Sequence, residues 1–142
     1  MIPLAAIRSR LLGQVTQFKS VRGSAALSAA LDRQQFANTE AYVLVANKAA
    51  GKNELVNAVS QRTTAQIAVM YWIKDAADAT GEKAGDDNEA VVDALQAALL
   101  NWTPDPAFTP FNYSGGKMVQ FAPPFVLYSE EFTTTFLVRK TS

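Results

Sequence analysis

Apolar residues recur at steps of three and four positions in two stretches of the chain, residues 3–18 and residues 87–101. That spacing places them on one side of an α-helix, with most polar residues on the other side. Pro104 follows the second stretch and ends its helix. A shorter, alanine-rich helix is expected over residues 25–33, with Ser24 as its capping residue. The pattern therefore predicts two main helices and one short helix.

Strands are predicted where apolar and polar residues alternate, or where β-branched and aromatic residues cluster. The longest is residues 63–74, whose core face carries Ala65, Ile67, Val69, Tyr71 and Ile73. The others are residues 42–46, 117–121, 125–128 and 131–139. We expect an α+β fold: one domain over residues 1–142, with a mixed or antiparallel sheet of about four to five strands and two main helices packed on one face.

Three polar or glycine-containing stretches interrupt these elements. Residues 47–61 show no clear period, which predicts a long surface loop or the arm of a long hairpin. Residues 75–88 are predicted to form an acidic loop that does not match the spacing of a calcium-binding loop. At its end Asp86 and Glu89 have the spacing of a capping box for the second main helix. Residues 112–116 are expected to form a tight turn with positive φ at glycine.

The composition narrows the chemistry that the chain can perform. It has no cysteine and no histidine, which excludes disulfides, thiolate metal sites and a Ser-His-Asp triad. Glu130 and Glu131 are the only exposed acid pair expected close to a strand, and adjacent residues on a strand point to opposite faces, so these two cannot act as a pair. Gly115-Gly116-Lys117 lacks the remaining positions of a phosphate-binding loop. We therefore predict no enzyme activity, no cofactor and no metal.

The charge of the chain is balanced, with 13 basic and 13 acidic residues among 142. A neutral chain has no long-range attraction to nucleic acid or to anionic membranes, and self-association meets little repulsion. Arg8 and Arg10 interrupt the apolar residues at the N-terminus, so no signal peptide is expected. No apolar run approaches the ~20 residues that span a bilayer. We expect a soluble intracellular protein.

Four short motifs give the C-terminal third a recognisable character. Asn-Trp-Thr-Pro at 101–104 ends a helix, and a Pro- and Phe-rich segment leads to Phe-Asn-Tyr-Ser-Gly-Gly at 111–116. Phe-Val-Leu-Tyr at 125–128 precedes Phe-Thr-Thr at 132–134, in a closing strand that ends at Arg139. With the order of elements, these residues resemble the tail terminator proteins of tailed bacteriophages, in particular the small family of Mu-like phages. The matching residues look like fold-forming residues rather than a catalytic signature.

The resemblance implies a function in virion assembly. Such proteins form a ring, usually hexameric, on the head-proximal end of the tail tube, stop tube polymerisation and offer a platform for head–tail joining. It implies three partners: further copies of the chain, the tail tube protein and a head-completion or connector protein. It also implies a place in the virion tail, reached from the host cytoplasm. Another small tail-completion or head–tail connector protein, or an unrelated non-enzymatic binding module, remains an alternative.

Candidate contact residues come from the chain itself. Met70 and Trp72 lie on the second face of the long strand, where a covering helix or a subunit interface would explain such residues. If Trp72 meets a partner, Trp72→Glu is expected to weaken self-association and leave the monomer folded. Lys48, Lys52 and Arg62, in or beside residues 47–61, are candidates for contact with a neighbouring subunit or the tube, with a solvated loop as the alternative.

Overall fold

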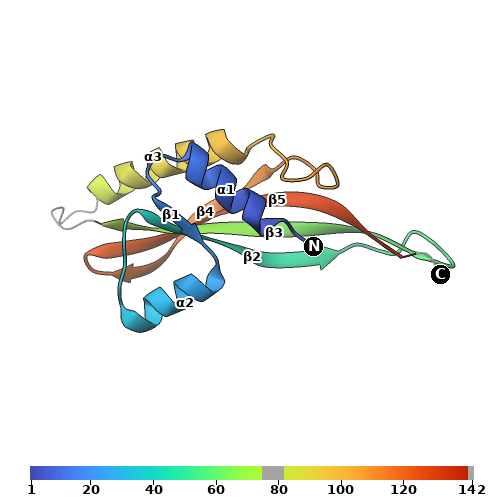
Figure 1. Cartoon of the computed structure of the whole chain (residues 1–142), viewed down its shortest axis with the longest axis horizontal. Helices are drawn as coiled ribbons and strands as arrows, with labels where there is room; N and C mark the ends of the chain where they lie inside the picture. The colour runs from blue at the N-terminus through green and yellow to red at the C-terminus, as the bar shows by residue number, and fades with distance from the viewer. Residues whose placement is uncertain (75–81, 141–142) are drawn as a thin grey trace.

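The computed structural model describes residues 1–74 and 82–140 and has an α+β fold, as predicted (Figure 1). Its five-stranded sheet has the order β1-β2-β3-β5-β4, with β1 parallel to β2 and the other neighbours antiparallel. In chain order the elements are α1 (Leu4–Gln14), β1 (Ser20–Arg22), α2 (Ser24–Arg33), β2 (Glu40–Ala50), β3 (Val59–Lys74), α3 (Glu82–Leu99), β4 (Asn112–Ala122) and β5 (Phe125–Lys140).

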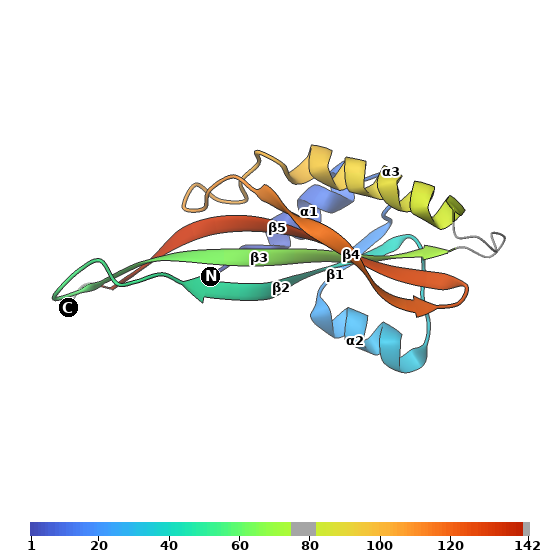
Figure 2. The same ribbon diagram turned by 180° about the vertical axis from the view of Figure 1, so that it is seen from behind.

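Helices α1 and α3 cover one face of the sheet, and α2 lies on the opposite face (Figures 1 and 2). The two main helices therefore share one face, as the sequence predicts, and the short helix covers the other. No helix in the described ranges is long and apolar enough to cross a membrane.

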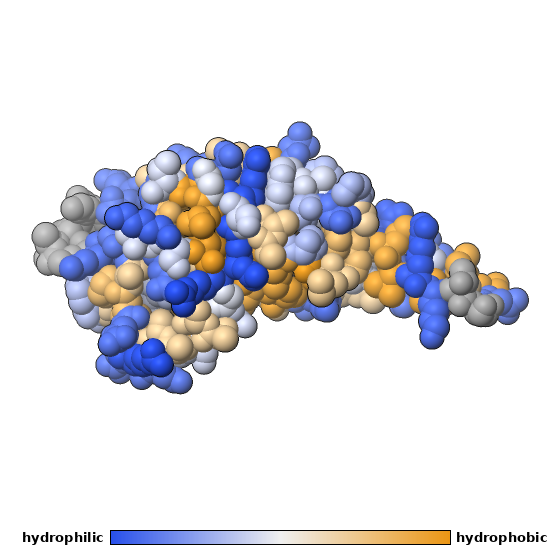
Figure 3. Space-filling model, in the orientation of Figure 1, coloured by the Kyte–Doolittle hydropathy of each residue, from blue (hydrophilic) through white to orange (hydrophobic). Residues whose placement is uncertain are grey.

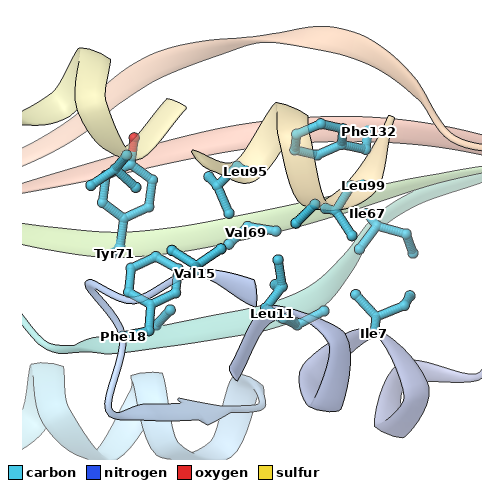
Figure 4. Packing of buried hydrophobic residues seen from close by; sticks show 14 of the residues in the cluster. Ile7, Leu11, Val15, Phe18, Ile67, Val69, Tyr71, Leu95, Leu99 and Phe132 are labelled. Atoms are coloured by element: carbon cyan, nitrogen blue, oxygen red, sulfur yellow. The ribbon is translucent and has the colours of Figure 1, made fainter. Parts of the chain in front are cut away.

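The larger core lies between the sheet and the helices α1 and α3 (Figure 4). Alternation along β3 sends every second side chain to this face, where it is buried. Full burial of one such aliphatic side chain contributes roughly 1.5–3 kcal/mol. The best-buried members include Ile7, Leu11, Ile67, Val69, Tyr71, Leu95, Leu99 and Phe132.

A smaller core lies under α2 and contains Trp72, which is fully buried. The Trp72 ring stacks on Phe36 with 4.0 Å between ring centroids, and its indole N–H donates to the Tyr42 hydroxyl at 3.4 Å. Met70 is half-buried and packs against the same cluster. The covering helix therefore accounts for the burial of Trp72, which has no exposed surface in the single chain.

Several predicted boundaries differ from the observed ones. The first helix ends at Gln14, and Gly23 rather than Ser24 occupies the N-cap of α2, with no side-chain hydrogen bond there. Helix α3 begins at Glu82, so Asp86 and Glu89 lie inside it and the predicted capping box is wrong. Neither residue lies in the first turn, where acidic side chains complement the helix dipole. The remainder of the predicted acidic loop, residues 75–81, lies outside the described residues.

The C-terminal third forms one long hairpin of β4 and β5, joined at a cis Pro123-Pro124 bond. The two predicted strands at 125–128 and 131–139 are continuous in β5. Residues 112–116 are part of β4 and not a tight turn. Gly115 does have a positive φ, of 136°, because the pairing with β5 shifts register between Tyr113 and Gly115.

Candidate assembly surface

The distal ends of β2, β3 and β5 continue past the helices as a three-stranded arm, defined here as residues 46–64 and 135–140 (Figures 1 and 2). Ala50 pairs with Thr63 across β2 and β3, and Val59 pairs with Lys140 across β3 and β5. Residues 47–50 thus belong to β2 and residues 59–61 to β3. Of the two interpretations of residues 47–61, the hairpin arm is the observed one, and only residues 51–58 connect the strands.

The tip of the arm, residues 51–58, is ordered by hydrogen bonds to Asn53. Its side-chain oxygen accepts the N–H groups of Leu55 at 3.2 Å and Ser60 at 2.9 Å, and its amide nitrogen donates to the Ala58 carbonyl at 3.1 Å. Val56 is 96% exposed and Leu55 is 49% exposed. A tip held in one conformation loses little entropy when it meets a partner, so its apolar side chains are well suited to docking.

The arm is the basic part of a neutral chain. It holds five basic residues and one acidic residue, Glu54, a net charge of +4, so the rest of the chain carries −4. Within the described ranges one ion pair is present, between Arg22 and Glu40, and it lies outside the arm. Figure 3 shows apolar surface along the arm, interrupted by strongly hydrophilic side chains. The basic residues are Lys48, Lys52, Arg62, Arg139 and Lys140.

Lys48, Lys52 and Arg62, three of the five candidate residues, are thus brought together on the arm, and all three are exposed. They do not share one face. Lys48 is opposite Ala65, whose side chain is on the α1 face of the sheet, whereas Arg62 precedes Thr63 and points to the other face. Lys52 lies in the tip. The arm therefore offers cations to partners on both sides.

A cavity of about 330 Å³ lies at the base of the arm, beside the N-terminus of the chain. Thr63 lines it and is only 5% exposed, and its Oγ1 has no hydrogen-bond partner in the described ranges. Sequence reasoning missed this cavity because it depends on the pairing of three strands. The only local signal was the β-branched pair Thr63-Thr64 at the predicted start of the long strand. The lining residues are Met1, Ile2, Lys48, Ala50, Gln61, Thr63, Phe136 and Val138.

The two adjacent glutamates face opposite sides of the sheet, as predicted. Glu131 accepts a hydrogen bond from the Gln66 side chain at 3.3 Å, and Glu130 accepts one from the Tyr113 hydroxyl at 3.2 Å on the other face. Glu130 is not exposed, contrary to expectation, and its burial raises the pKa of its carboxyl above the ordinary value. A side chain at Gly116 would overlap this carboxyl, so the glycine makes the burial possible.

A family model described as "Phage tail terminator protein" matches residues 1–142, the whole chain. No curated protein matches it.

Proposed function

This chain belongs to the phage tail terminator family, and on that premise we propose that it caps the head-proximal end of the tail tube as a ring. In this proposal the ring, hexameric as the resemblance implies, stops tube polymerisation and provides the platform for head–tail joining. The family match over the whole chain is the observation that carries the proposal. It makes the chain a component of the phage tail with a role in tail completion.

The arm supports a capping role physically. A protein that ends a polymer must bind its own copies and the last ring of the tube at once. A basic arm that projects from the body, with an ordered apolar tip, supplies contact surface away from the core. We infer that Lys48, Lys52 and Arg62 contact a neighbouring subunit or the tube protein, and that a head-completion or connector protein binds the completed ring.

Ring formation requires a head-to-tail contact, in which two different surfaces of the subunit meet. Such a contact closes into a ring only if the rotation from one subunit to the next is a whole fraction of a turn, and otherwise it builds a filament. The zero net charge of the chain means that the subunits do not repel one another strongly as whole bodies.

We also propose that the function is purely structural and needs no cofactor or direct recognition of nucleic acid. The absence of cysteine and histidine from the sequence supports this, because these side chains carry much of nucleophilic and general-base catalysis. The protein would act in the host cytoplasm during assembly and remain at the head-proximal end of the virion tail.

Tube length tests the proposal. The tube protein of the same phage is allowed to polymerise with and without this chain, and tube lengths are measured by electron microscopy. We expect shorter tubes, with the chain at one end only. The double substitution Lys52→Glu and Arg62→Glu should reduce this effect. If tube growth continues unchanged while the chain binds the head connector, the function is head–tail connection and not termination.

A further inference from the structure

The first half of α3 is the acidic counterpart of the arm. Asp86, Asp87 and Glu89 are all exposed, and none of them has an ion-pair partner among the described residues. The beginning of α3 and the tip of the arm lie at opposite ends of the long axis of the molecule (Figure 1). The two charged surfaces therefore cannot reach each other within one chain.

The cavity at the base of the arm has the chemistry of a carboxylate site. Lys48 and Thr63 both line it, and the buried hydroxyl of Thr63 has no hydrogen-bond partner among the described residues. The Gln61 amide nitrogen is already engaged, since it donates to the Gly51 carbonyl at 3.0 Å. Ile2, Phe136 and Val138 make the walls apolar. A carboxylate accepts hydrogen bonds from both a hydroxyl and an ammonium group, and charge-assisted bonds of this kind are the strong ones.

We propose that the acidic first half of α3 from a second copy of this chain docks on the arm, with one of its carboxylates held by Lys48 and Thr63. The inference rests on the proposed ring and names the contact between its neighbouring subunits. Because the two surfaces are different and lie at opposite ends, the contact is head-to-tail and repeats from subunit to subunit.

The sign of the charge favours α3 of a second copy, rather than Glu54 of a second copy, as the acidic group that binds the arm. Glu54 of a second copy would bring its own basic arm against this one, and two surfaces of net charge +4 repel each other. The exposed carboxylates of α3 meet the arm with the opposite sign. Such exposed charges are screened over roughly 10 Å at 0.1 M salt, so the assembly weakens as salt is raised.

Charge-swap variants test the contact, with native mass measured by light scattering over a concentration series. Lys48→Glu should raise the concentration needed for half-assembly about tenfold or more, and so should the pair Asp86→Lys and Asp87→Lys. Combining the three substitutions should restore most of the loss. Arg139→Glu makes the same charge change on the arm, on the face away from Thr63, and should have a much smaller effect.

Thr63→Val provides an independent readout. It removes the unpartnered hydroxyl and keeps the shape, so the monomer should melt at a higher temperature while assembly weakens about tenfold, as expected for a hydrogen bond to a charged group. A role in folding alone would not move the two measurements in opposite directions.

The contact is refuted if the native chain stays monomeric at every concentration, if Lys48→Glu leaves assembly intact, or if the swap restores nothing. Tube capping is scored separately. If the contact is refuted but the chain still shortens tubes, the proposed function stands without this contact. If rings form as expected but tube growth is unchanged, the proposed function is rejected and the contact stands. Loss of capping by Lys48→Glu with assembly unchanged would place the tube protein on the arm, and would also overturn the inference.

Discussion

Trp72→Ala should destabilise the monomer strongly, because the side chain is fully buried between the sheet and α2. Removal of a buried Trp or Phe costs about 3–5 kcal/mol. The stack with Phe36, at 4.0 Å between centroids, is lost with the indole ring and is part of this cost. A chain of 142 residues has an unfolding entropy of about 0.3 kcal/mol/K. The melting temperature should therefore fall by about 10–17 °C.

Thermal unfolding followed by circular dichroism measures the effect, with native mass recorded on the same samples. Phe121→Ala is the control, since this ring is 62% exposed and its loss should cost less than about 0.5 kcal/mol. If Trp72→Ala does not fold, Trp72→Phe keeps an aromatic ring and should cost about 1–3 kcal/mol. A fall of less than about 3 °C for the alanine variant, together with lost self-association, would show that Trp72 meets a partner and not α2.

Three further predictions concern the β4–β5 hairpin and the arm. Gly116→Ala displaces the buried Glu130 carboxyl and should lower the free energy of unfolding in urea by about 1–3 kcal/mol. Gly13→Ala is the control: the position is helical with open space around it, so the substitution should raise the free energy of unfolding by about 0.5–1 kcal/mol. A stabilised Gly116→Ala protein would contradict the packing described. Burial raises the pKa of Glu130 in the folded state, so the protonated carboxyl favours folding. The free energy of unfolding of the native protein, compared with that of Glu130→Gln, should therefore be greatest below pH 4.5. It should decline as the pH rises through the folded-state pKa. A difference that grows with pH would refute this sign. Asn53→Ala removes three hydrogen bonds in the tip and should speed amide hydrogen exchange in residues 51–58 while exchange in the core stays unchanged; unaltered exchange in the tip would show that Asn53 does not order it.

The elements that the sequence predicts well are those with one buried and one exposed face. In α1, α3 and the inner half of β3, burial on one face imposes a clear period, so Ile67, Val69 and Tyr71 could be placed in the core from the sequence. The outer part of the arm, residues 47–50 and 59–61, lacks that period because neither of its faces is buried. Its polar residues gave no signal for the strands 47–50 and 59–61, which form because β2, β3 and β5 pair with one another.

The remaining differences depend on contacts between segments distant in the chain. The pattern of residues 25–33 predicts a helix and does not specify which face of the sheet it covers, so Trp72 remained open to two explanations. Glu130 is buried because Gly116 on β4 leaves space beside it and Tyr113 supplies a donor. Only the pairing of β4 with β5 brings these residues together, and a single sequence does not give that register.

The buried cores that stabilise the molecule lie apart from its exposed apolar side chains and its polar or charged groups without partners. The two cores are closed around β3, and their large side chains have partners within the chain. The arm, in contrast, exposes Leu55 and Val56. Within the part of the chain that the structure describes, the Thr63 hydroxyl has no hydrogen-bond partner, and neither the basic residues of the arm nor the exposed acids of α3 at the other end form an ion pair. A folded chain violates local rules mainly where function requires it. Each of these features is one that contact with another subunit would satisfy, so substitutions on the arm should alter assembly at little cost to folding, and substitutions around Trp72 should do the reverse.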